Sequence, residues 1–101
     1  MDITITPSSS LTVHSDSYAK KCNGKAYLNI RIDGISVGAN TGIKICSLSE
    51  KPIKLVRYWS INLNNNTVIH TYIDTSGDVW LYPTQALSGH NIQFNGVFII
   101  A

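Results

Sequence analysis

Residues 72–83 read YIDTSGDVWLYP, two short runs rich in β-branched and aromatic side chains on either side of Ser76-Gly77. This pattern predicts two half-buried strands that fold back on each other around a tight turn. The large rings at Tyr72, Trp80 and Tyr82 suit either a hydrophobic core or a surface that holds a flat ligand such as a sugar. We expect a mixture, with one ring in the core and at least one exposed or at an interface.

The same kind of pattern extends in both directions from this hairpin. Helix-period patterns are nearly absent, and short runs of β-branched and aromatic residues alternate with polar ones between turn signals. Strands are expected near residues 3–5, 11–20, 26–32, 43–48, 53–65, 67–74, 79–82 and 92–101. The sequence therefore predicts an all-β protein, an antiparallel β-sandwich of the jelly-roll kind forming a single domain over residues 1–101, with an open barrel as the alternative.

Turn signals give more local expectations. Asn23-Gly24 is the pair that favours a type I′ hairpin turn. Residues 33–42 carry three glycines and predict a loop with a short strand at 35–37. A second loop is expected over residues 83–91. Asn95-Gly96 lies within the last apolar run, where a bulge or bend is expected because too few residues follow for a return strand.

Composition limits the functional classes. The 101 residues are 44% hydrophobic and 14% charged, with a formal net charge of +2. No dense basic run supports nucleic-acid binding, and no apolar run is long enough to span a bilayer. The first ten residues lack the pattern of a signal peptide, which predicts a soluble protein made in a cytoplasm. So little charge predicts a surface of Ser, Thr and Asn or one covered by other subunits, and the apolar end VFIIA is expected in the core or at an interface.

Catalytic and metal-binding patterns are weak. None of the three histidines belongs to a nucleophile or metal motif, so no cofactor and no enzymatic activity are predicted. Asp74 and Asp78 flank the Ser76-Gly77 turn and suit a glycoside-cleaving pair or a calcium site, although capping of their own turn is favoured. Cys22 and Cys46 are too few for a disulfide framework and are expected to be free thiols.

The aromatic residues give the clearest indication of a binding site. One of Trp59 and Trp80 is expected at the centre of the core. Tyr58 and Trp59 must point to opposite faces of their strand, so aromatic rings also reach the outside. A sugar stacks its C–H face on such rings while polar side chains bind its hydroxyls. The candidate contact residues are Arg57, Tyr72, Trp80, Tyr82 and His90, and Gln85 suits the same role.

Residues 47–101 resemble the C-terminal head domain of phage tail-fibre and baseplate receptor-binding proteins. The residues that carry the resemblance are Ile73, Thr75, Gly77, Val79 and Leu81 in the hairpin and Ile92, Phe94, Gly96, Phe98 and Ile100 in the last strand. Leu48 is followed by Ser49 where the family has Pro, and only Pro52 remains of its Gly-aromatic-Arg-Pro segment. The first 45 residues match less clearly.

The resemblance implies an antiparallel β-sandwich that forms a homotrimer in a virion tail, beside other tail or baseplate proteins. It also implies that the domain recognises saccharide on the surface of a bacterial host, in whose cytoplasm it is made, without catalysis. Two alternatives remain at this point. One is a structural virion or tail-assembly protein that binds no sugar, and the other is a small glycan-cleaving domain.

Overall fold

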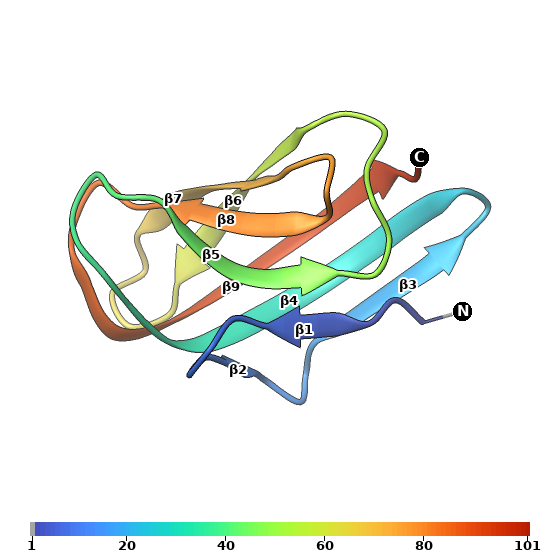
Figure 1. Cartoon of the computed structure of the whole chain (residues 1–101). Helices are drawn as coiled ribbons and strands as arrows, with labels where there is room; N and C mark the ends of the chain where they lie inside the picture. The colour runs from blue at the N-terminus through green and yellow to red at the C-terminus, as the bar shows by residue number, and fades with distance from the viewer. Residues whose placement is uncertain (1) are drawn as a thin grey trace.

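Nine strands form one antiparallel sheet in the computed structural model, which describes residues 2–101 (Figure 1). They are β1 (Ile5–Pro7), β2 (Thr12–Val13), β3 (Tyr18–Cys22), β4 (Lys25–Val37), β5 (Ile43–Leu48), β6 (Val56–Asn62), β7 (Val68–Ile73), β8 (Asp78–Tyr82) and β9 (Leu87–Ile99). The sheet order is β1-β5-β8-β7-β6-β9-β4-β2, and β3 also pairs with β4. The all-β, antiparallel prediction is confirmed. The described residues contain no helix long and apolar enough to cross a membrane.

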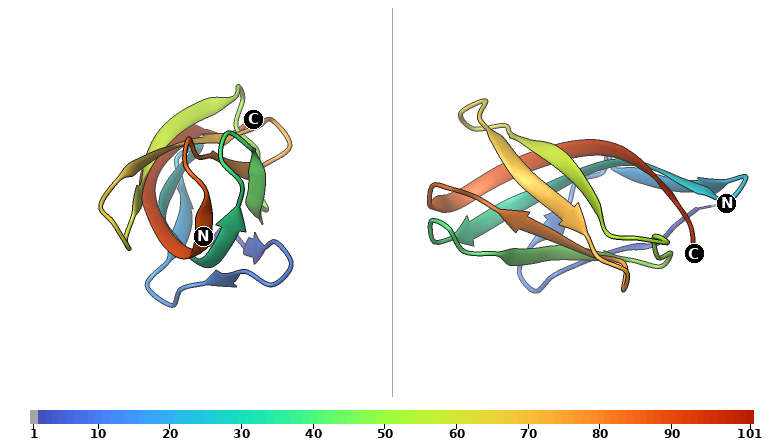
Figure 2. Two further views of the ribbon diagram at one scale, coloured as in Figure 1. Left: turned by 90° about the vertical axis from the view of Figure 1, so that its left-hand side faces the viewer. Right: turned by 90° about the horizontal axis from the view of Figure 1, so that it is seen from above.

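The sheet curls until its two ends nearly meet. β1 pairs with β5 at one end, while the residues just before it reach the other end. There, Ile3 N donates to Ala19 O at 2.8 Å, and Asp2 and Lys20 form an isolated bridge. The end-on view in Figure 2 shows the resulting barrel-like shape. The fold therefore combines the packed inner faces of a sandwich with the near closure of the open barrel.

The core lies inside this curled sheet and is mostly aliphatic. Its largest fully buried hydrophobic side chains are Ile30, Ile32, Ile35, Ile45, Ile73, Val79, Leu81 and Ile92. Burying each of these contributes about 1.5–3 kcal/mol relative to leaving it in water. The buried aromatic residues are Phe94 and Phe98. The expectation of a tryptophan in the core was wrong, because both tryptophans occupy outward-facing positions of their strands.

Two predicted turns are confirmed. Asn23 and Gly24 have φ angles of 52° and 74°, as a type I′ turn between β3 and β4 requires. Gly77 turns the chain between β7 and β8 with φ 86°. A Cβ atom at Gly77 would lie 2.8 Å from the carbonyl oxygen of Leu48, so glycine is needed there for space as well as for conformation.

The first half of the chain departs from prediction at two places. The short strand expected at residues 35–37 is present as the end of β4, which continues to Val37 through a register shift at Gly34, whose φ is 85°. The loop expected over residues 33–42 therefore begins only after Val37. Gly34 thus forms a bulge within a strand and not a loop. The expected strand over residues 11–20 is two strands, since a turn closed by the Ser17 N to His14 O hydrogen bond separates β2 from β3.

The last strand also differs from prediction. β9 begins at Leu87, so the loop expected over residues 83–91 is short. No bulge occurs at Asn95-Gly96, where pairing with β4 is regular. Gly96 serves another purpose: the Tyr58 ring of β6 lies so close that a Cβ atom would be 2.6 Å from its Cζ. In the apolar C-terminal run, Phe98 is buried while Val97 and Ile99 are exposed.

Candidate functional site

Six outward-facing side chains form a continuous surface across β6, β7 and β8. Strand register sets them in two rows of three: Arg57, Tyr72 and Trp80 in one, and Trp59, His70 and Tyr82 in the other. We call these six residues the aromatic face. Since neighbouring strands are about 4.8 Å apart, each row extends roughly 10 Å across the sheet. That extent suits one or two sugar rings.

The rings of the aromatic face are regularly spaced. Ring centroids lie 6.0 Å apart for Trp59 and His70, 6.0 Å for His70 and Tyr72, and 6.3 Å for Tyr72 and Trp80. The Tyr72 and Trp80 planes are only 11° from parallel. These contacts restrict the rings and lower the entropy lost when a ligand stacks on them.

Hydrogen bonds hold the edges of the aromatic face. Arg57 Nη1 lies 3.3 Å from His70 Nε2. The indole Nε1 of Trp80 donates to Asp74 Oδ2 at 3.1 Å, while Asp74 Oδ1 accepts from the backbone N–H groups of Ser76 and Asp78. Asp74 therefore caps its turn, as predicted, and also orients the Trp80 ring.

The aromatic face is open to solvent. Trp59 is 65% exposed and Tyr82 is 43% exposed, while Tyr72 and Trp80 are partly exposed. The expectation that one ring of residues 72–83 lies in the core was wrong. Tyr72, Trp80 and Tyr82 alternate with buried Ile73, Val79 and Leu81, so all three rings fall on the outer face.

Four of the five candidate contact residues lie on the aromatic face, and His90 does not. His90 is on β9, where its Nδ1 accepts a hydrogen bond from Nδ2 of the buried Asn62 at 2.9 Å. The two members of the aromatic face that were not candidates are Trp59 and His70. Strand parity could have found them, because Trp59 lies two residues from Arg57 and His70 two residues from Tyr72.

The carboxylates that flank the turn have separate structural partners. Asp78 Oδ1 accepts from Ser47 Oγ of β5 at 2.8 Å, so the prediction that Asp78 caps its own turn was wrong. Asp74 is engaged by its turn and by Trp80. Among residues 2–101, no cluster of three or more His, Cys, Asp or Glu side chains is placed to hold a metal ion.

The two cysteines are free thiols in very different surroundings. Cys22 is exposed beside the type I′ turn, and Cys46 is buried. Burial, with a smaller contribution from the negative charge of Asp78, raises the pKa of Cys46 to about 12. Cys46 is therefore a protonated core residue at neutral pH and is unsuited to act as a nucleophile.

A second group of exposed apolar side chains lies on β9 and on the segment before β6. Ile53, Val97 and Ile99 are 50–60% exposed, and Leu55 is 42% exposed. Ile53, Val97 and Ile99 line a groove of about 390 Å³ together with Val56, Phe98 and the lysines Lys25 and Lys54. So much neighbouring apolar surface is typical of a protein–protein interface.

Comparison with known proteins places the fold in a class. No family model matches the sequence, and no curated protein matches it. The fold is one found in receptor-binding head domains of phages. The crystal structure of the head domain of the lactococcal phage bIL170, reported in a study of the receptor binding domains of lactococcal phages, matches with a TM-score of 0.76 at 14% identity. The match covers 96% of this chain and 94% of that chain, so the likeness noted over residues 47–101 extends, as a fold, over nearly the whole chain.

Proposed function

We propose that this chain is a receptor-binding module of a phage tail that recognises saccharide on the surface of its bacterial host. The observation that carries the proposal is the aromatic face, where the rings of Trp59, His70, Tyr72 and Trp80 follow one another at centroid distances of 6.0–6.3 Å on an exposed sheet surface. The fold shared with a phage head domain supports the same assignment.

The chemistry of the aromatic face suits a sugar. Trp80, Tyr72 and Trp59 offer flat apolar surfaces for the C–H face of a pyranose ring. Arg57 and the Tyr82 hydroxyl stand at the edges as hydrogen-bonding groups for its hydroxyls. Nothing in this arrangement requires a reactive group, and the proposed role is binding without catalysis.

The proposed assembly is a homotrimer joined to other tail or baseplate proteins. Support comes from the groove lined by Ile53, Val97 and Ile99, which another subunit would cover. Several copies on one particle would raise overall binding by roughly two to four orders of magnitude over a single weak site. A solution mass near three times 11.1 kDa is the expected result of light scattering.

Binding is tested with a multivalent fusion of the protein on a glycan array and on host cell walls. We expect signal from the parent and from Thr75→Ala, which changes an exposed turn residue, and strongly reduced signal from Trp80→Ala at unchanged oligomeric state. Absence of any signal from the multivalent parent would refute saccharide recognition.

A second candidate function is tail assembly without saccharide binding. The exposure of Ile61 and Val68, which lie opposite each other beside the aromatic face, favours it because they would extend an apolar contact with another subunit. Under this alternative, Trp80→Ala breaks the oligomer instead of abolishing glycan binding by an intact one. The mass measurement on that variant separates the two functions.

A further inference from the structure

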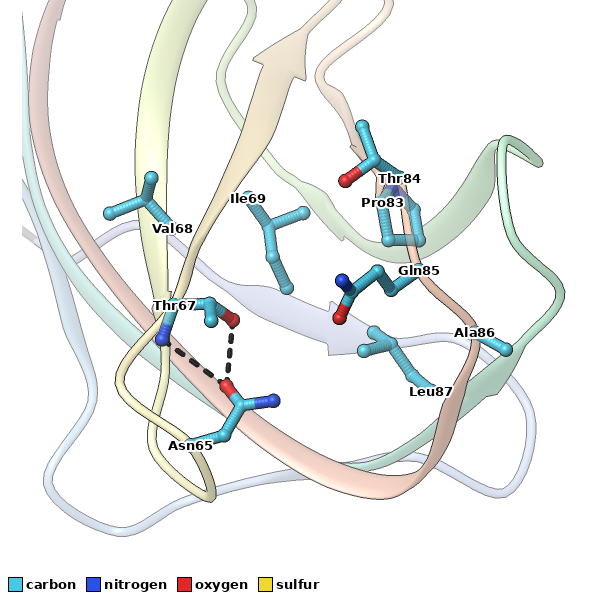
Figure 3. Close-up of a pocket in the computed structure, with 9 residues that line it drawn as sticks. All are labelled: Asn65, Thr67, Val68, Ile69, Pro83, Thr84, Gln85, Ala86 and Leu87. Atoms are coloured by element: carbon cyan, nitrogen blue, oxygen red, sulfur yellow. Dashed lines mark hydrogen bonds between the residues drawn. The ribbon is translucent and has the colours of Figure 1, made fainter.

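A small pocket lies at the end of the sheet where β8 separates from β7. Pairing between these strands ends at His70 and Tyr82. Pro83 then offers no N–H to continue the ladder, and its carbonyl accepts instead from Asn40 N at 2.8 Å. The chain reaches β9 at Leu87 by a path that leaves a hollow of about 120 Å³ beside the first residues of β7 (Figure 3).

The lining of this pocket divides into an apolar floor and a neutral polar rim. Ile69, Pro83 and Leu87 form the floor and are buried, while the rim carries exposed Asn65, Thr67, Thr84 and Gln85 beside the exposed apolar Val68 and Ala86. Thr67 donates to Asn65 Oδ1 from both its backbone N and its Oγ1. Figure 3 shows the Gln85 amide directed toward the side of the pocket that holds Asn65 and Thr67, with no hydrogen bond to the other residues drawn.

The charge, polar groups and size of the pocket indicate which class of ligand it would bind. None of the lining residues carries a charge, so the pocket offers no counter-ion to an acidic or basic ligand. Its amide and hydroxyl groups both donate and accept, as sugar hydroxyls do, above a floor that suits C–H groups. At about 120 Å³ it is smaller than the roughly 300–1,000 Å³ of pockets for drug-sized ligands, which limits the occupant to one small unit.

We propose that this pocket is a subsite for one neutral sugar unit of a saccharide chain whose neighbouring units lie on the aromatic face. Val68, at the pocket rim, is two residues from His70 on the same outward side of β7, a step of about 7 Å. Thr84 follows Tyr82 by the same number of residues. The rim of the pocket thus follows the aromatic face along the strand direction, while its floor at Ile69 and Pro83 lies on the buried side of the sheet. This inference rests on the proposed function.

Access to the pocket is favourable. In Figures 1 and 2, both termini lie at one end of the sheet and the segment from Tyr82 to Leu87 lies at the other. Attachment through either terminus would leave the pocket end free to meet a surface.

The test is an amide-detected NMR titration of the full chain with monosaccharides. All of them contain a pyranose ring, and they differ in charge. The probes are D-glucose and D-galactose as neutral sugars, D-glucuronate as the anion and D-glucosamine as the cation. We expect the neutral sugars to shift the side-chain amide signals of Gln85 and Asn65, and the charged sugars to shift them at least about fivefold less at equal concentration.

Two variants establish where the sugar binds. Thr84→Phe fills the mouth of the pocket and should abolish the Asn65 shift, while Thr75→Phe places the same substitution on an exposed turn and should leave it unchanged. Gln85→Ala removes the free amide and should weaken the neutral-sugar shift at Asn65 several-fold. All three positions are exposed, so the variants are expected to fold.

The outcomes separate this inference from the proposed function. Shifts confined to the indole signals of Trp59 and Trp80 would overturn the pocket while leaving saccharide binding by the aromatic face intact. Equal shifts with charged and neutral sugars would overturn the ligand class. No shift at Gln85 or Asn65 with any probe would overturn the pocket, and the multivalent array would still decide the proposed function.

Discussion

Replacing Gly96 by alanine tests how the sheet is held together behind the aromatic face. β6 and β9 pair only at Ile61–Gln93 and Asn62–Ile92 and then diverge. The Tyr58 ring fills the space between them, where it stacks on Phe94 with centroids 5.8 Å apart and its hydroxyl donates to Val97 O at 2.9 Å. A Cβ atom at Gly96 would lie 2.6 Å from Cζ and 2.8 Å from Cδ1 of Tyr58. The ring must therefore move in Gly96→Ala.

The cost follows from what Tyr58 loses. The hydrogen bond to Val97 contributes about 1 kcal/mol, and the stacking on Phe94 about 0.5–1.5 kcal/mol. Alanine is favoured over glycine within a strand by roughly 0.5–1 kcal/mol, which offsets part of the loss, while strain from overpacking adds about 1–3 kcal/mol. We expect a net loss of about 3 kcal/mol in the free energy of unfolding. For a domain of this size that lowers Tm by roughly 12–24 °C.

The assay is denaturant unfolding of a double-mutant cycle. In a Tyr58→Ala background the new methyl group has room, so Gly96→Ala should be neutral or slightly stabilising. The coupling energy between the two sites should then exceed about 1.5 kcal/mol. Gly38→Ala is the matched control, because the nearest atom to its Cβ is 3.6 Å away, and it should change stability by less than about 0.5 kcal/mol. Additive effects of Tyr58→Ala and Gly96→Ala would refute the explanation.

Three further predictions follow from the structure. Trp80→Ala should weaken saccharide binding about tenfold or more in an array titration, and unchanged binding would remove this ring from the site. Cys22 should react with iodoacetamide in the folded protein and Cys46 only after unfolding. Because the pKa of Cys46 is raised from 9.0 to about 12, the free energy of unfolding should fall as the pH rises above about 9, and it should fall less in Cys46→Ala, which lacks this thiol. Gly77→Ala should destabilise by about 2 kcal/mol or more in denaturant unfolding, since it is strained at positive φ and its Cβ meets Leu48 O, and a change below about 0.5 kcal/mol would contradict this.

The fold class was predictable because its signals are local. Asn23-Gly24 specifies a tight turn from two residues, and period-2 alternation in residues 26–32 specifies one buried face. The bulge at Gly34 and the uninterrupted pairing at Gly96 were not predictable, because each depends on a partner distant in sequence. For Gly96 that partner is Tyr58, on a strand with which this part of β9 does not pair.

The candidate site was partly predictable for a similar reason. Alternation fixed that Tyr58 and Trp59 face opposite ways, yet it could not say which faces inward when both positions hold large rings. Tyr58 faces inward because Gly96 leaves room for its ring, and Trp59 therefore faces outward, where its ring contacts that of His70. His90 was wrongly placed with the other candidate contact residues. Its imidazole accepts a hydrogen bond from Asn62 on another strand, a contact that the sequence around neither residue indicates.

The near closure of the sheet has a consequence for how copies of this chain behave toward one another. An unpaired strand edge is a template for hydrogen bonding with another molecule. Residues 2–7 cover the edge of β5 and reach the edge of β3, so a truncation or a bulky N-terminal fusion that displaces them would expose both. The charged side chains on these two strands would then be Lys20 and Lys21 on β3 and Lys44 on β5, and such charges oppose edge-to-edge aggregation.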